Sequence, residues 1–273
     1  MVKVREDYAL TKDGQIDIEQ WVGRIQDLTG LEDVTALRKA CELSQAIDQE
    51  AVRADRLWAP GASSFRTGLE MAQILVDLHL DRDSLVAAIL YRAVREERIS
   101  LDRVRREFGA DIARLIDGVQ QMAAISAIHH PLKGNVLGQT QGQLDNVRKM
   151  LVTMIDDVRV ALIKLAERTC AIRAVKDAPA DKRLRVAREV FDIYAPLAHR
   201  LGIGHIKWEL EDLSFRYLHE SAYKKIAKQL DEKRVDRDAF IKRVLDTLRD
   251  ALGNMGIQAE LSGRSKHIYS IWR

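Results

Sequence analysis

The chain has 273 residues, of which 47% are hydrophobic and 31% are charged, and its net charge is only +3. This composition excludes an intrinsically disordered protein and a disulfide-rich mini-protein, because the chain can bury one sizeable core or two modest ones. The near balance of 44 Lys and Arg against 41 Asp and Glu argues against a dedicated polyanion-binding domain. Only four prolines and 5% aromatic residues occur, which is typical of a helical protein.

Neither cysteines nor apolar segments indicate a metal scaffold or a membrane protein. Cys41 and Cys170 form no CxxC motif, so we expect neither a thiolate zinc site nor a disulfide framework. The longest uninterrupted apolar run, residues 85–91, is too short to span a bilayer, and the first residues lack the apolar core of a signal peptide. We therefore expect a cytoplasmic protein with no membrane partner.

Helical periodicity dominates the first two thirds of the chain. Apolar residues recur at three- and four-residue spacing over residues 69–94, which predicts short amphipathic helices joined by tight turns. Residues 101–119 predict two helices broken at Gly109. Residues 129–143 hold one Pro, three Gly and several Gln without periodicity, so we expect a mobile or disordered loop. A long, largely buried helical stretch is predicted to begin near Gln143.

The last third starts helical and then changes character. Helical periodicity resumes over residues 181–203, where Pro196 and the pair Gly202 and Gly204 predict breaks, and it continues over 207–218 and 236–256. Residues 257–263 alternate like a β-strand. Since a strand needs partners and the rest of the chain shows little β-signal, we expect the front part of a longer protein, cut at the entrance to an α/β domain.

Three phrases carry a family resemblance: VRKMLVTMIDDVRVALIKLAER, YAPLAHRLGIGHIKWELEDLSFRYL and GRSKHIYSIWR. Together they closely resemble the long Rel/Spo family of enzymes, which make and degrade the alarmone (p)ppGpp. The resemblance covers residues 61–273. It implies an all-α fold with an HD-superfamily-like hydrolase domain over 1–180 and a helical connector over 181–220. The first elements of a truncated α/β synthetase domain would follow over 221–273.

The resemblance also shows where this chain departs from an active hydrolase. An HD hydrolase needs a His on one helix, a His-Asp pair on another and a distal Asp, because imidazole and carboxylate together hold a manganese-type metal that activates water. The corresponding positions hold Thr67 for the first His, Tyr91 and Arg92 for the His-Asp pair, and Glu167 for the distal Asp. An Arg at a cation site repels the metal by several kcal/mol at low dielectric. We therefore expect no metal here.

The positions that would act on substrate differ as well. Arg95 and Glu96 replace a catalytic Glu-Asp pair, and Ala171 replaces a nucleotide-contacting Asn. We expect no catalytic residue in this domain, and ion pairs in which Arg92 and Arg95 neutralise the nearby acidic side chains. This pattern resembles the RelA-type branch of the family, which is synthetase-only, associates with the ribosome and has a degenerate hydrolase domain.

The phrase GRSKHIYSIWR resembles the opening of the family's synthetase site. Arg264 and Lys266 match the Arg and Lys that hold the base and phosphates of ATP, and Ser270 matches a phosphate contact. A planar guanidinium and a point-charge ammonium suit a stacked base and a polyphosphate respectively. These residues would bind ATP, with Mg²⁺, only in a complete synthetase domain, so we expect no cofactor in this chain by itself.

These observations favour a regulatory role. We expect this chain to be the inactive pseudo-hydrolase region of a GTP pyrophosphokinase of the stringent response. It would dock on its own synthetase domain, while other parts of the parent contact the ribosome and tRNA. Two alternatives stay open. One is a metal-dependent (p)ppGpp 3′-pyrophosphohydrolase with substituted ligands, and the other is an alarmone-sensing module that binds guanine nucleotides through Arg92, Arg95 or Arg168.

Overall fold

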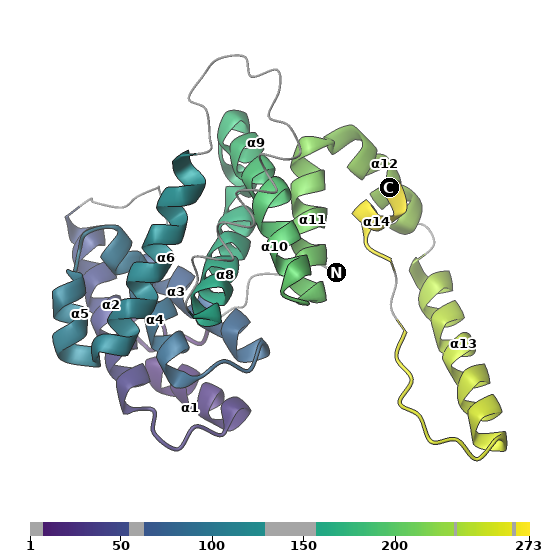
Figure 1. Cartoon of the computed structure of the whole chain (residues 1–273), viewed down its shortest axis with the longest axis horizontal. Helices are drawn as coiled ribbons and strands as arrows, with labels where there is room; N and C mark the ends of the chain where they lie inside the picture. The colour runs from purple at the N-terminus through teal and green to yellow at the C-terminus, as the bar shows by residue number, and fades with distance from the viewer. Residues whose placement is uncertain (1–7, 55–62, 129–156, 232–233, 264–265) are drawn as a thin grey trace.

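The computed structural model describes residues 8–54, 63–128, 157–231, 234–263 and 266–273. The predicted loop over 129–143 and the predicted start of a helix near Gln143 lie outside these ranges. Within them the chain forms helices and no strand, apart from an isolated bridge between Leu10 and Ile16. Figure 1 shows an N-terminal bundle, a second group of helices packed on it, and a C-terminal arm that extends away from both. The all-α fold class is confirmed.

The N-terminal bundle is built from helices with local start signals. In several of them a side chain accepts a hydrogen bond from a backbone N–H in the first turn, at Asp17, Ser63, Asp81, Ser100 and Asp157. The helices are α1 (Ile18–Thr29), α2 (Thr35–Arg53), α3 (Ser64–Asp77), α4 (Arg82–Arg95), α5 (Leu101–Phe108), α6 (Ala110–Ile128) and α8 (Val158–Ala174).

Gly109 separates α5 from α6, as the sequence predicts. Its φ of 101° and ψ of 166° lie in a region that only glycine adopts without strain. The Gly109 N–H donates to the carbonyl of Arg105 at 3.1 Å and closes α5. The next helix, α6, begins at Ala110, directly after this glycine.

Two helices run through the core and carry the positions of interest. Residues 84–91 of α4 are all buried, and so are residues 163–170 of α8. A helix that is buried around its whole circumference is normally apolar, but α8 buries Lys164, Glu167 and Arg168. Buried charges are stable only when they are paired, so this stretch of α8 requires internal partners.

The second group of helices forms one nearly continuous run followed by a turn. It consists of α9 (Ala180–Glu189), the π-helix η2 (Val190–Tyr194), α10 (Ala195–Arg200) and α11 (Gly204–Leu218). The predicted break at Pro196 is wrong. Proline lacks an N–H and clashes with the carbonyl four residues earlier, and the chain accommodates it by widening the preceding turn, where the Ala195 N–H donates to Val190.

The predicted break at Gly202 is confirmed. Gly202 has a φ of 75°, in the left-handed region. Its N–H donates to His199, and the N–H of Ile203 donates to Ala198 at 2.9 Å, which together form a Schellman motif. This motif reverses the chain between α10 and α11, so that α11 packs back against α9 and α8.

The C-terminal arm contains α12 (Glu220–Asp231), α13 (Arg234–Asn254) and the short α14 (Ile268–Trp272). The predicted strand over 257–263 is wrong, since these residues have no regular secondary structure. No strand among the described residues is available to pair with them. Instead the segment runs back along α13 (Figure 1), where Gly263 lies against Ile241 and Leu245. The division into domains at 180 and 220 stays a prediction.

Candidate functional site

The positions expected to hold a metal lie on three helices that pack on one another. Thr67 is on α3, Tyr91 and Arg92 are on α4, and Glu167 is on α8. The helices α3 and α4 pack closely, and α8 packs against both. The four positions therefore lie on helices that pack together, and their side chains determine what this region can bind.

Two of these side chains cannot act as metal ligands in this geometry. The Thr67 hydroxyl donates to the carbonyl of Ser63 in its own helix at 2.9 Å. Tyr91 is fully buried, and its hydroxyl has no hydrogen-bond partner among the described residues. Burial, and after it the negative charge of Glu167, raises the pKa of Tyr91 to about 12. The phenol is therefore neutral at physiological pH.

Arg92 lies in an ion-pair network centred on Glu96. Its Nη2 is 3.0 Å from Glu96 Oε1, and Arg98 Nη2 is 2.9 Å from Glu96 Oε2. The Ser64 hydroxyl donates to Glu96 Oε1 at 2.7 Å. Burial lowers the pKa of Arg92, and Glu96 partly offsets that effect by favouring the charged guanidinium. The expected pairing of Arg92 with an acidic neighbour is confirmed.

Glu167 is the centre of a second, more deeply buried network. Its side chain is 2% exposed, and three cations surround the carboxylate. Arg168 forms a bidentate pair with it, at 2.6 Å from Nε to Oε2 and 2.5 Å from Nη2 to Oε1. Lys164 Nζ is 2.9 Å from Oε2, and Arg95 Nη1 is 2.9 Å from Oε1. Each carboxylate oxygen therefore accepts two charge-assisted hydrogen bonds.

The cations determine the charge state of this carboxylate. Burial by itself would raise the pKa of Glu167, but Arg168 and Lys164 outweigh burial and hold the pKa well below its ordinary value. Burial lowers the pKa of Lys164 to about 8, while Glu167 works in the opposite direction. Glu167 is therefore ionised, and its lone pairs are already occupied by nitrogen donors.

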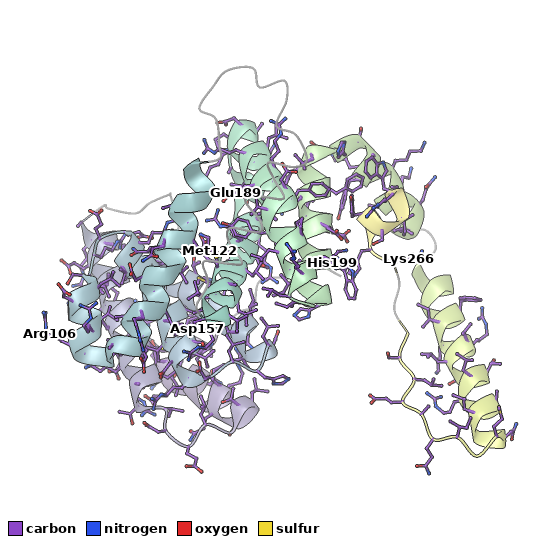
Figure 2. All side chains as sticks on the ribbon, viewed as in Figure 1. Arg106, Met122, Asp157, Glu189, His199 and Lys266 are labelled. Carbon is purple, nitrogen blue, oxygen red and sulfur yellow. The ribbon has the colours of Figure 1, made fainter. Side chains whose placement is uncertain are left out.

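The Glu167 network extends into the second group of helices. Arg168 Nη1 is 3.1 Å from Glu189 Oε2 at the end of α9. The ring of Tyr194, in the π-helix, lies 6.0 Å from Lys164 Nζ and 5.9 Å from Arg168 Cζ, within cation–π range. Figure 2 shows Glu189 where the second group of helices meets the bundle. Lys164 and Glu189 were not among the site residues expected from the sequence.

This donor set does not fit a divalent metal. Thr67 and Tyr91 are poor ligands, Arg92 is a cation, and the carboxylate of Glu167 is saturated by Lys164, Arg168 and Arg95. Over the part of the chain that the structure describes, no group of three His, Cys, Asp or Glu side chains could hold a metal ion. Ala171, at the expected position of an Asn, is half-buried on α8 and offers only a methyl group.

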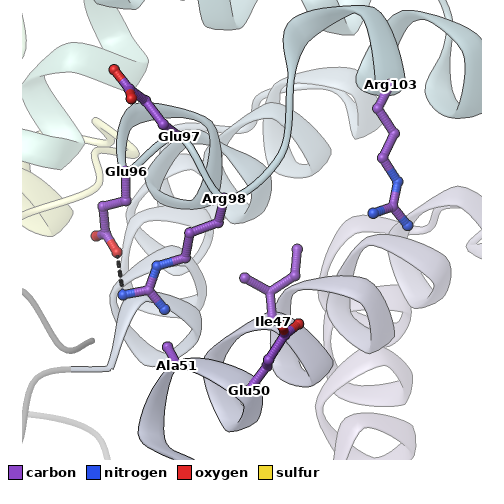
Figure 3. A pocket seen from close by; sticks show the side chains of 7 residues that line it. All are labelled: Ile47, Glu50, Ala51, Glu96, Glu97, Arg98 and Arg103. Atoms are coloured by element: carbon purple, nitrogen blue, oxygen red, sulfur yellow. Dashed lines mark ion pairs between the residues drawn. The ribbon is translucent and has the colours of Figure 1, made fainter. Parts of the chain in front are cut away.

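A cavity of about 500 Å³ adjoins the Glu96 network. Figure 3 shows it between the end of α2 and the turn that follows α4, with Arg98 directed at Glu96. It is lined by Ile47, Glu50, Ala51, Glu96, Glu97, Arg98 and Arg103. The lining contains three glutamates and two arginines, so the cavity itself has no strong preference for an anion.

The second expected site lies elsewhere in the molecule. Figure 2 places Lys266 far from Glu189, on the other side of α11. Lys266 and Ser270 are both exposed, and Arg264 lies outside the described residues. The structure therefore does not bring the candidate ATP-binding residues together with the Glu167 network. Two elements lie between them, because α11 and the π-helix η2 both contact the C-terminal segment.

A match to a known family of domains shows which class of protein this chain belongs to. A family model described as "HD domain" matches residues 40–204, more than half of the 273 residues, so the chain belongs to the HD-domain family. The match spans α3, α4 and α8, the helices that carry the site. None of the described helices combines the length and apolar character that crossing a bilayer requires.

Similar proteins narrow this class to the Rel/Spo family. A GTP pyrophosphokinase of Photobacterium angustum is 46% identical over 244 residues, 88% of this chain and 32% of that protein. A GTP pyrophosphokinase of Escherichia coli K12 is 41% identical over 273 residues, 100% of this chain and 35% of that protein. A guanosine-3′,5′-bis(diphosphate) 3′-pyrophosphohydrolase of Haemophilus influenzae is 39% identical over 203 residues. These residues make up 74% of this chain and 29% of that protein. The chain spans about a third of the length of these curated relatives.

Proposed function

We propose that this chain is the regulatory pseudo-hydrolase region of a RelA-type GTP pyrophosphokinase, and that its HD domain performs no hydrolysis. The observation that carries the proposal is the Glu167 network. Lys164, Arg168 and Arg95 occupy the carboxylate that would be a metal ligand, so cationic side chains replace the metal. A domain that keeps its packed core without a metal can still bias a neighbouring catalytic domain through differential contacts of a few kcal/mol.

The hydrolase alternative has one argument in its favour, which is the similarity to a relative named as a pyrophosphohydrolase. Two proteins with similar sequences share the same helices, but they need not share the side chains that bind a metal. Hydrolysis depends on those few side chains. Tyr91 and Arg92 cannot replace an imidazole and a carboxylate around a hard divalent ion. The site chemistry therefore favours the pseudo-hydrolase.

An assay of metal content and hydrolysis tests the proposal. The purified chain, incubated with Mn²⁺ and (p)ppGpp, is expected to retain no stoichiometric metal and to release no pyrophosphate. The Haemophilus influenzae relative serves as the positive control under the same conditions. Stoichiometric manganese together with pyrophosphate release from this chain would contradict the proposal.

A chimera tests the synthetase part. In it, this chain replaces the matching segment of the Escherichia coli relative, to which it aligns over its full length. We expect the chimera to form (p)ppGpp from ATP and GTP or GDP. A folded chimera that makes no product would contradict the assignment to a pyrophosphokinase.

One observation favours an alarmone-sensing module as a second candidate. Arg95 keeps 40% of its side chain exposed and contacts Glu167 through Nη1, so part of its guanidinium faces solvent. Isothermal titration of (p)ppGpp and of ATP, repeated with Arg95→Ala and Arg92→Ala, distinguishes the candidates. Binding of (p)ppGpp that is lost in these variants would support a sensor, and the absence of binding would leave the scaffold role.

A further inference from the structure

The segment from Lys266 to the end of the chain has two faces with different roles. His267, Tyr269 and Trp272 contact aromatic side chains of the preceding helices, whereas Lys266 and Ser270 are exposed. The residues expected to contact ATP thus lie on the free side of a segment that is fixed by its other side. The contacts that hold the segment in place therefore also determine the orientation of Lys266 and Ser270.

Asp212 on α11 fixes the start of α14. The N-cap residue His267 makes no side-chain capping bond, so α14 has no local cap. Asp212 supplies the cap from 57 residues earlier in the chain, because its Oδ1 accepts from the Tyr269 N–H at 2.9 Å. Its Oδ2 lies 3.4 Å from the Ile268 nitrogen and 3.3 Å from His267 Nδ1. The Asp212 side chain is only 10% exposed, which strengthens these interactions relative to a solvated pair.

Ring contacts hold the same segment at three further points. The His267 ring stacks on Trp208 of α11, with centroids 5.3 Å apart and planes inclined by 22°. Tyr269 packs edge-on against Phe191 and Phe215, at 5.4 and 5.8 Å. Such pairs add modest stabilisation but define orientation well. The segment is therefore fixed in rotation as well as in position.

The helix that holds this segment is also attached to α8. Glu209, three residues before Asp212, accepts a bidentate pair from Arg173 of α8, at 2.6 and 2.8 Å. Arg173 lies on the same helix as Glu167. One helix, α11, therefore contacts the pseudo-hydrolase core through Glu209 and the C-terminal segment through Asp212.

We propose that Asp212 is a positioning residue for nucleotide binding: it caps α14 from α11 and so presents Lys266 and Ser270 to ATP. This inference rests on the proposed function, a GTP pyrophosphokinase, and on the family resemblance by which this segment is expected to open its synthetase site. It adds that the orientation of the segment is set by the helical connector, through a carboxylate that does not touch the nucleotide.

The first arm of the test measures docking and does not depend on ATP. In this chain, Asp212→Ala removes the acceptors, so hydrogen exchange at the Ile268 and Tyr269 amides is expected to accelerate about tenfold, the effect of losing a helix cap. Asp212→Asn keeps a side-chain oxygen and is expected to preserve most of the protection. Glu211→Gln is the matched control, because it removes a carboxylate that pairs with Lys207 on the same helix. Unchanged exchange in Asp212→Ala would overturn the proposal.

The second arm measures the consequence for ATP. Because ATP binding is expected only in a complete synthetase domain, the titration uses the chimera with the Escherichia coli relative. Calorimetric titration of the chimera with Mg²⁺ and ATP is expected to show binding that Asp212→Ala weakens at least threefold and Asp212→Asn largely restores. If the Asp212→Ala variant loses docking but keeps its ATP affinity, Asp212 is only structural and the proposal fails while the proposed function stands. If Lys266→Ala in the chimera leaves the ATP affinity unchanged, the assignment of this segment to a nucleotide site fails, and the inference fails with it.

Discussion

A β-carbon on Gly68 would lie 2.8 Å from the carbonyl oxygen of Ile89 and 2.9 Å from its Cα, so α3 and α4 meet backbone to backbone at this point. The contact lies one residue after Thr67 and two before Tyr91. It sets the distance between the two helices that carry these positions.

Gly68→Ala is expected to lower the free energy of unfolding by about 1–3 kcal/mol, because neither backbone can move aside as a flexible side chain would. Chemical denaturation monitored by circular dichroism measures the change. The matched control is Gly23→Ala on α1, where a β-carbon meets nothing within 4 Å and the substitution is expected to be neutral or slightly stabilising. If the two substitutions changed the free energy of unfolding equally, the close approach of α3 and α4 at Gly68 would be refuted.

Removing the negative charge at the centre of the buried network is expected to be costly. Glu167→Gln leaves Lys164, Arg168 and Arg95 without their shared counter-charge, which corresponds to about 3–5 kcal/mol for a broken buried ion pair. Glu50→Gln, on an exposed position of α2, is the control. Adding Lys164→Met to Glu167→Gln should recover part of the loss, since one uncompensated cation then disappears. Strictly additive effects in this double-mutant cycle would show that the two side chains do not interact.

The same network predicts acid sensitivity. Arg168 and Lys164 hold the pKa of Glu167 well below its ordinary value of 4.5. Above pH 4.5 the stabilisation by the ionised carboxylate is fully present in the folded protein. Below it the unfolded chain takes up a proton that the folded chain does not, so the stabilisation declines as the pH falls. The difference in unfolding free energy between the unsubstituted chain and Glu167→Gln is expected to shrink steadily below pH 4.5. A pH-independent difference would contradict the depressed pKa.

Recovery of a metal site is expected to require several substitutions at once. Tyr91→His by itself leaves Arg92 in place and Glu167 saturated, so it should neither bind Mn²⁺ nor hydrolyse (p)ppGpp. Measurable hydrolysis by the single variant would show that the site is less altered than its contacts indicate.

Hydrogen exchange should separate the C-terminal arm into two parts. Residues 258–263 have no regular secondary structure and are largely exposed, so their amides should exchange almost as fast as in an unfolded peptide. Amides in the buried stretch of α8, residues 163–170, should exchange slowest. Comparable protection of both segments would mean that residues 258–263 have a stable pairing partner.

The sequence predicts local features well and long-range ones poorly. Gly109 and the capping side chains act within a few residues, so their effect can be recognised from spacing. The pairing of Arg92 with Glu96 follows the four-residue helical spacing and was predictable for the same reason. Alternation over 257–263 predicts a strand wrongly, because a strand exists only when another strand pairs with it, and the pattern of one segment cannot supply that partner.

The composition of the Glu167 network was only partly predictable. Lys164 precedes Glu167 by three residues and Arg168 follows it directly, so both could have been recognised as partners from the sequence. The pairings of Arg95 with Glu167 and of Arg168 with Glu189 span 72 and 21 residues. They depend on how α4 and α9 pack against α8, which no local pattern encodes.

In the proposed pseudo-hydrolase, side chains take the place of a metal, which changes what the domain responds to. A bound ion is in equilibrium with solution, so a fold that needs it gains stability in proportion to the logarithm of the free ion concentration. Lys164, Arg168 and Arg95 are covalently part of the chain, and their local concentration around Glu167 is constant. Under this proposal the packing of α4 on α8 is independent of the manganese concentration, and a signal that alters the domain arrives through contacts with other parts of a protein or with a ligand.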